Sequence, residues 1–349
     1  MLQAFREIRT HAARAGGINA IPMHTQLFAI AEGFDDTIVA RVVPPVCRMP
    51  IDRGSPIVEA GDTVIATPVW SPGCPARHFV PAVSVLGPSP SAFRVELAVE
   101  RAGIWSPWVA AATLGGDGFA ALPDTDAVSC DIDVFTATAA VTAVRGRVRV
   151  KGTLSPPWLV TLSVCDQAPV QRRTPRGGEV RITVPARTQA AEPEPMRWHI
   201  CSPTSVAMVL GRWGRRVETA ALAAEIFQPL LGRYGVWPAA IAAAGRHGVA
   251  GYLLRFPDWA SAAWCLDAGL PIVASVRYAS GELAGAAMDR TDGHLVVVTG
   301  YEDDTALVND PAAPTEADVP RRVRIDDLER VWLERTGVGY VLFDPLQMR

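Results

Sequence analysis

The stretch Cys201-Ser-Pro-Thr-Ser205 decides which fold to expect, because it opens a run of residues whose apolar side chains recur at helical spacing. The apolar residues that share one face of this predicted helix are Val206, Val209, Leu210 and Trp213. A cysteine in the first turn of a helix lies among unpaired backbone N–H groups and at the positive end of the helix dipole, which both stabilise its thiolate. The sequence therefore predicts an inward-packed helix with a reactive cysteine at its N-terminal end.

Two short segments further along the chain carry the partners that such a cysteine needs, Asp292-Gly-His294 and Asn309-Asp-Pro311. His294 begins an apolar run typical of a buried strand, and its imidazole can hold the thiolate of Cys201 as an ion pair. Asp310 can then orient the imidazole, as the third member of a catalytic triad does. The order cysteine, histidine, aspartate predicts nucleophilic catalysis by the C-terminal half of the chain.

Length and composition limit the classes of protein to consider. The chain has 349 residues, most naturally two domains, and its 49% hydrophobic residues suffice for a sizeable core. The net charge of −3 argues against a nucleic-acid binder, because such proteins attract phosphates with an excess of basic side chains. The sequence has no apolar run of about 18 residues, and residues 1–30 lack the apolar core of a signal peptide. We therefore expect no membrane span and a cytoplasmic protein, with secretion as the alternative.

The six cysteines lie far apart, at positions 47, 74, 130, 165, 201 and 265, and no two form a Cys-x-x-Cys pair. A zinc site and a dense disulfide framework are therefore not expected, and the sequence implies no cofactor. Four of the six fall in the N-terminal half, where one or two disulfides remain possible.

The sequence pattern of the N-terminal half is typical of an all-β domain. After a lead-in segment over residues 1–27, short runs rich in β-branched residues alternate with Pro, Gly, Ser and Asp turns such as 87–91 and 115–118. The expected strands are 36–43, 63–69, 93–99, 128–135, 140–150 and 159–164. This spacing predicts a β-sandwich or jelly-roll domain over residues 28–167, followed by a polar, arginine- and proline-rich linker over residues 168–183.

The sequence pattern changes over residues 184–349, where it predicts helices first and strands after them. The expected helices are 204–213, 219–227, 238–247, 259–268 and 325–333, and the expected strands are 271–278, 294–301, 306–309 and 339–343. Helices followed by an antiparallel sheet predict an α+β domain.

Motifs in this second domain, in register with one another, resemble the peptidase C39-like family, whose fold is similar to that of the papain superfamily. The matching segments are Val184-Pro185, Gln189, the run from Cys201 to Gly211, the run from Gly293 to Tyr301, Val308-Asn-Asp-Pro311, Leu328-Glu-Arg-Val-Trp332 and Gly339-Tyr-Val-Leu-Phe343. The resemblance covers about residues 184–343, nearly half of the chain, and implies a papain-like fold for that half.

The resemblance also implies a role for each matching polar residue. Cys201 would be the nucleophile that forms a thioester acyl-enzyme, and His294 the general base and acid. Asp310 would fix the tautomer of the imidazole, and Gln189 would stabilise the oxyanion together with the backbone N–H of Cys201. Ser202 follows the nucleophile where the family usually has glycine. The segment between Gln189 and Cys201 must loop out if the amide is to reach the site.

Simpler interpretations exist for several residues. A cysteine at a helix start is often a small buried hydrophobe, His294 could cap a core strand, and Asp310 before a proline could make an Asx-turn. Other polar or aromatic residues are assigned to packing or to the surface. These are His199 at the rim of the site, Asp292 in a solvated turn, Cys265 in the core, and Trp105-Ser-Pro-Trp108 as a turn with two packed indoles, with a sugar-stacking platform as the alternative.

We therefore expect a cysteine peptidase-like thiol hydrolase that cleaves a peptide or related amide bond through an acyl-thioester. An acyltransferase with the same Cys-His-Asp chemistry and a non-catalytic papain-like binding module are the alternatives. The expected partner is a peptide or amide substrate, and the N-terminal β domain could bind a polymer or protein that carries the scissile bond. That β domain is also weakly similar to modules that precede bacterial C39-like domains.

Overall fold

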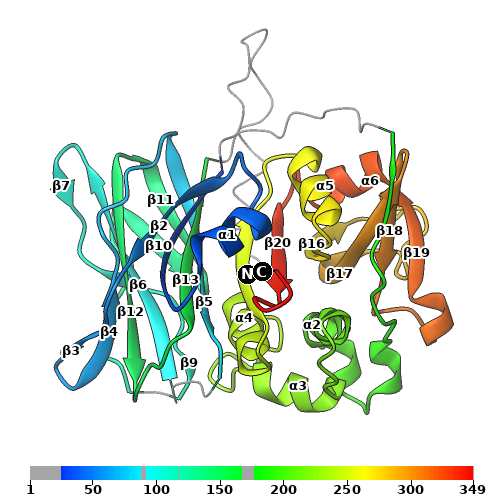
Figure 1. Cartoon of the computed structure of the whole chain (residues 1–349), viewed down its shortest axis with the longest axis horizontal. Helices are drawn as coiled ribbons and strands as arrows, with labels where there is room; N and C mark the ends of the chain where they lie inside the picture. The colour runs from blue at the N-terminus through cyan, green and yellow to red at the C-terminus, as the bar shows by residue number, and fades with distance from the viewer. Residues whose placement is uncertain (1–24, 88–91, 117, 167–176, 349) are drawn as a thin grey trace, which may run out of the picture.

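The structure is a computed structural model that describes residues 25–87, 92–116, 118–166 and 177–348 (Figure 1). Most of the expected lead-in segment, the turn residues 88–91 and 117, and residues 167–176 of the expected linker lie outside the described residues. Two β-sheets lie in the N-terminal half of the described chain, and a third sheet, surrounded by helices, lies in the C-terminal half.

The strands of the N-terminal half are β1 (Gln26–Glu32), β2 (Arg48–Arg53), β3 (Ile57–Glu59), β4 (Asp62–Ala66), β5 (Ala76–Val85), β6 (Ala92–Arg101), β7 (Ile104–Trp105), β8 (Val109–Ala110), β9 (Leu114–Gly115), β10 (Val128–Asp131), β11 (Val134–Val141), β12 (Ala143–Lys151) and β13 (Trp158–Cys165). The first sheet has the order β10-β11-β5-β13-β1-β2, and the second has the order β3-β4-β12-β6-β7, with β8 and β9 also paired to β6. Alternate residues of β12 face the core, as expected for a strand with one buried face, with Val148 buried between Arg147 and Arg149. The expected strand-rich character of this half is confirmed.

Two of the strand predictions in this half are wrong. Residues expected as a strand over 36–43 form helix α1 (Asp36–Val42), because the Asp35 carboxylate caps the helix by accepting the Thr37 N–H at 2.8 Å. The β-branched residues of this segment lie at helical spacing and bury one face of the helix. The single strand expected over 128–135 is the hairpin β10–β11, whose turn contains Ile132 at a φ of 60°.

The C-terminal half contains the helices α2 (Cys201–Arg212), α3 (Thr219–Ile226), α4 (Trp237–Arg246), α5 (Trp259–Asp267) and α6 (Ile325–Val331). Its strands are β14 (Glu179–Arg181), β15 (Ala250–Arg255), β16 (Ile272–Tyr278), β17 (Thr291–Glu302), β18 (Thr305–Asn309), β19 (Pro320–Arg324) and β20 (Val338–Phe343). They form one antiparallel sheet in the order β15-β20-β16-β17-β18-β19, with β14 paired to β17. All five expected helices are present within a few residues, whereas β15, β19 and β14 were not expected. Strand β14 lies inside the segment expected to be a linker.

The two halves share a tight border along β15, the edge strand of the third sheet. The backbone N–H of Gly251 donates to the Ser84 hydroxyl at 3.3 Å, and that of Arg255 donates to the Ser163 hydroxyl at 3.1 Å. These serines come from β5 and β13, so the first sheet satisfies edge N–H groups that would otherwise remain unpaired. The backbones also approach closely elsewhere on this border, since a Cβ on Gly245 of α4 would lie 2.5 Å from the carbonyl oxygen of Val85.

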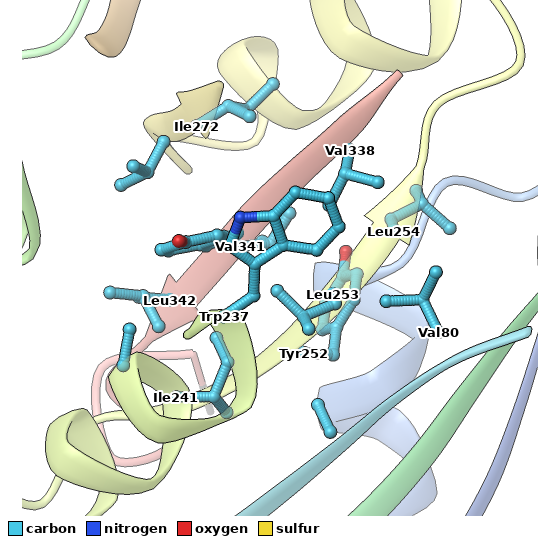
Figure 2. Packing of buried hydrophobic residues seen from close by; sticks show 14 of the residues in the cluster. Val80, Trp237, Ile241, Tyr252, Leu253, Leu254, Ile272, Val338, Val341 and Leu342 are labelled. Atoms are coloured by element: carbon cyan, nitrogen blue, oxygen red, sulfur yellow. The ribbon is translucent and has the colours of Figure 1, made fainter. Parts of the chain in front are cut away.

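A continuous apolar core crosses this border. Figure 2 shows side chains of α4, β15 and β20 packed around the indole of Trp237, with Val80 of β5 on the side of the first sheet. Trp237 and Val80 are both buried. None of the helices that the structure describes is long and apolar enough to cross a membrane.

Candidate active site

The candidate nucleophile, Cys201, is the first residue of α2, where backbone N–H groups have no partner within the helix. Thr204 is the first residue whose N–H bonds within the helix, to the Ile200 carbonyl at 2.9 Å. Pro203 has no N–H, so the backbone N–H groups of Cys201 and Ser202 are the free donors of this turn. The N–H of Ser202 contributes to lowering the pKa of the Cys201 thiol. Cys201 itself remains partly exposed.

Strand β17 holds the start of α2 in place through one residue, Leu295. The N–H of Leu295 helps to lower the pKa of the Cys201 thiol, and its carbonyl accepts a hydrogen bond from the Ser205 hydroxyl at 3.1 Å. Cys201 and Ser205 are four residues apart and therefore lie on the same side of the helix. Strand β18 pairs with β17 only from Val297 onward, which leaves the backbone of Leu295 available to α2. The thiol is thereby fixed against the strand that carries the histidine.

His294 precedes Leu295 on β17 and is almost fully buried. Its Nε2 donates to Oδ1 of Asp310 at 2.7 Å. The imidazole also makes a hydrogen bond with the Cys201 thiol, and Nδ1 is the ring nitrogen left for it. The structure therefore brings Cys201, His294 and Asp310 into one connected row.

Asp310 follows the end of β18 and is held by more than the histidine. Oδ1 also accepts the N–H of Ala312 at 3.0 Å, which is an Asx-turn, and Oδ2 accepts the N–H of Ala287 at 3.0 Å. The turn and the contact with His294 thus occur together, and the turn aims the carboxylate at the imidazole.

The electrostatics of the row favour a thiolate beside an imidazolium. Burial by itself raises the pKa of Cys201, but the hydrogen bond and charge of His294 and the N–H groups of Leu295 and Ser202 outweigh it, so the pKa lies below its usual range. Burial lowers the pKa of His294, yet the hydrogen bonds of Asp310 and Cys201 raise it overall, to about 10. Burial raises the pKa of Asp310, whereas the hydrogen bond and charge of His294 and two backbone N–H groups lower it overall. This is the charge distribution that an activated cysteine requires.

Gln189 lies beside the same bend of the chain. It begins a short 3-10 helix, η2 (Gln189–Ala191), and its N–H donates to the carbonyl of Pro311 at 2.9 Å. Its side chain is buried, and its Oε1 has no hydrogen-bond partner. The following residues loop out through a second 3-10 helix, η3 (Met196–Trp198), before the chain reaches Cys201. The segment between Gln189 and Cys201 thus contains two 3-10 helices, and the role of Gln189 in stabilising an oxyanion stays a prediction.

The remaining candidates take the simpler interpretations. His199 is exposed, and so is the Asp292 side chain, which is 87% accessible. Cys265 is buried in the core. The guanidinium of Arg145 lies 4.5 Å from the ring centre of Trp105 and 5.0 Å from that of Trp108, so both indoles pack against this cation.

None of the six cysteines forms a disulfide, so neither of the disulfides considered for the N-terminal half is present. Within the described ranges, no group of three or more His, Cys, Asp or Glu side chains is placed to hold a metal ion. The sequence did not reveal the contributions of Leu295 and Ala287, because both act through their backbone N–H groups.

Residues 181–340 match the sequence model of the Peptidase_C39 like family. Among solved structures, the chain is similar to a double glycine motif protease from an AMS/PCAT transporter in complex with the leader peptide, with 19% identity, a TM-score of 0.33, and coverage of 50% of this chain and 96% of that chain. It is also similar to a C39-like peptidase from Bacillus anthracis, with 19% identity, a TM-score of 0.38, and coverage of 47% and 97%. No curated protein sequence matches the chain. The motifs and the sequence match agree: residues 181–340, a little under half of the chain, match the peptidase C39-like family, and this match supports a cysteine peptidase-like function.

Proposed function

We propose that this chain is a cysteine peptidase-like thiol hydrolase that cleaves a peptide or related amide bond with Cys201 as the nucleophile. The observation that carries the proposal is the row of Cys201, His294 and Asp310, in which Nε2 of His294 lies 2.7 Å from the Asp310 carboxylate and the imidazole lowers the pKa of the Cys201 thiol. The C39-like family also includes inactive members, so family membership alone does not establish catalysis. An intact and electrostatically matched row argues for an active member.

In the first step, the thiolate of Cys201 attacks the carbonyl carbon of the scissile amide. A carbon–sulfur bond forms while the carbonyl electron pair moves onto oxygen, and the N–H of Cys201 and the side-chain amide of Gln189 are the proposed donors to that oxyanion. The imidazolium of His294 then gives its proton to the leaving nitrogen, the carbon–nitrogen bond breaks, and an acyl-thioester remains.

In the second step, the now neutral imidazole of His294 takes a proton from water, and the resulting hydroxide attacks the thioester carbonyl. The carbon–sulfur bond breaks, the acid product leaves, and the thiolate and imidazolium are restored. Throughout both steps Asp310 holds the ring orientation and stabilises its positive charge. If an amine replaces water in this step, the same residues catalyse acyl transfer.

We also propose that the two-sheet region over residues 28–167 is a β-sandwich and that residues 184–349 are a papain-like α+β unit. The serine contacts and shared core along β15 support a fixed border between these units rather than a flexible tether. A polymer or protein partner for the β-rich unit remains a prediction.

The test is selective alkylation of Cys201. The protein is treated with iodoacetamide at pH 6, and the modified cysteines are identified by peptide mass spectrometry. Cys201 should react first, because its pKa is lowered, whereas burial raises the pKa of the partly exposed Cys74 to about 11 and makes it an internal reference. The variant His294→Ala should lose this selectivity. Alkylation of Cys201 no faster than that of Cys74 would refute the proposal.

A second measurement separates catalysis from passive binding. Incubation with a peptide mixture should release cleavage products and leave a transient acyl mass on Cys201, and Cys201→Ala should abolish both. Added primary amines would appear in the products if acyl transfer competes with hydrolysis. Alkylation without turnover of any peptide or amide would favour the binding module.

A further inference from the structure

The residue that follows the nucleophile has a buried hydroxyl with a single counterpart. Ser202 stands where the C39-like family usually has glycine, and its side chain is 0% exposed. Its Oγ lies 3.1 Å from the Tyr340 hydroxyl, which is also 0% exposed. Ser202 therefore places a hydroxyl in the core that needs a partner, and β20 supplies one.

Tyr340 is well placed to hold Ser202 still. It lies on β20, between β15 and β16 inside the third sheet, where its backbone pairs with Leu253 and Val273. A tyrosine ring has only two side-chain torsions, so a hydroxyl on a central strand is a rigid anchor. Burial is the main cause of the raised pKa of Tyr340, and the charge of the nearby Cys201 also raises it.

The anchored residue is the one whose backbone touches the sulfur. The backbone N–H groups of Leu295 and Ser202 both help to lower the pKa of Cys201. Leu295 is tied to α2 through Ser205, whereas Ser202 is tied to the sheet through Tyr340. Each of these two residues is thus held in place by a side-chain hydrogen bond, Ser202 by Tyr340 and Leu295 by Ser205.

We infer that Ser202 and Tyr340 are positioning residues for Cys201, whose buried hydroxyl pair fixes the first peptide of α2 so that the Ser202 N–H points at the sulfur. This inference rests on the proposed role of Cys201 as the nucleophile. A merely structural role is the weaker explanation, because alanine at 202 and phenylalanine at 340 would keep most of the packing without burying two hydroxyls.

The test compares the pH dependence of Cys201 alkylation in wild type, Tyr340→Phe, Ser202→Ala and the double variant. Loss of the Ser202–Tyr340 hydroxyl pair should make the Ser202 N–H less well positioned and raise the midpoint of the alkylation profile by about half a pH unit to one pH unit. Below the midpoint this corresponds to a rate of alkylation that is about three- to ten-fold lower. The double variant should shift the midpoint no further than either single variant, because the two hydroxyls act as one pair.

Tyr252→Phe is the matched control. Tyr252 is an equally buried tyrosine of the same sheet, on β15, and its hydroxyl donates to the carbonyl of Val42, away from Cys201. This variant should lower the thermal stability as Tyr340→Phe does, but it should leave the alkylation midpoint unchanged.

The outcomes separate this inference from the proposed function. A low wild-type midpoint that stays fixed in folded Tyr340→Phe and Ser202→Ala would overturn the positioning role and leave the nucleophile in place. Equal shifts in Tyr340→Phe and Tyr252→Phe would also overturn it, since the effect would then reflect stability alone. The absence of any selective Cys201 alkylation in wild type would instead refute the proposed function.

Discussion

Replacing Asp310 with asparagine removes the negative charge behind the imidazole while keeping the size of the side chain. In the native site the two carboxylate oxygens accept three hydrogen bonds, from His294, Ala312 and Ala287. An asparagine has only one oxygen, so its NH₂ group must face one of these N–H donors. Asp310→Asn therefore removes the negative charge beside His294 and replaces one hydrogen bond with a repulsive contact between two N–H groups.

The structure gives the size of the effect. The rise of the His294 pKa from 6.5 to about 10 corresponds to roughly 5 kcal/mol at about 1.4 kcal/mol per unit, and Asp310 and Cys201 share it. If Asp310 supplies about half, its loss destabilises the thiolate–imidazolium pair by roughly 2 kcal/mol, a ten- to hundred-fold effect. We expect the rate of Cys201 alkylation at pH 6 to fall by that factor.

The assay is the rate of iodoacetamide alkylation from pH 4 to 10, followed by mass spectrometry. The matched control is Asp344→Asn, which also removes a buried carboxylate, one paired with Arg215 at 3.1 Å. That variant should lose stability but keep the wild-type profile. A profile for Asp310→Asn within two-fold of wild type at every pH would refute the reasoning.

The same pair predicts how stability depends on pH. The pKa of His294 is raised, so its stabilising contribution is complete below its unfolded value of about 6.5 and is lost as the pH rises toward about 10. The pKa of Asp310 is lowered, so its contribution is present above about pH 4 and is lost in acid. Urea unfolding should therefore show that Asp310→Asn costs most between about pH 4 and 6.5 and least near pH 10.

Two further predictions concern the border between the two halves. Burial raises the pKa of Asp133, whose carboxylate accepts the Trp237 N–H at 3.0 Å, to about 7, so its stabilising contribution is complete below about pH 4 and lost as the pH rises through 7. Asp133→Asn should therefore raise the free energy of unfolding at pH 8, by up to about 4 kcal/mol, and change it little at pH 4; urea unfolding that shows no such pH difference would contradict this. Gly245→Ala should lower the free energy of unfolding by about 1–3 kcal/mol or more, because its Cβ would meet the Val85 carbonyl at 2.5 Å, whereas Gly235→Ala, with nothing within 4 Å, is the control. Equal thermal melts for the two alanine variants would argue against the close border.

The sequence predicted the helical elements of the C-terminal half best, because their apolar spacing and end residues are local properties. It failed at α1, where β-branched residues suggested a strand but the Asp35 cap and a buried face produced a helix. It also missed β15, whose pairing depends on β20 and on serines from the first sheet, all distant in the chain. Strand assignments depend on such partners more than helices do.

For the candidate site, the residue types and their order along the chain were enough to select Cys201, His294 and Asp310 and to place the segment in its family. Whether those side chains meet, and what holds them, was decided by tertiary structure. The backbone donors of Leu295 and Ala287 and the hydroxyl of Tyr340 have no signature in the sequence, because any residue can offer an N–H and a core tyrosine looks the same wherever its hydroxyl points. The order of residues determines which reactive side chains the chain carries. The direction in which a backbone N–H or a hydroxyl points is determined only when strands from distant parts of the chain pair.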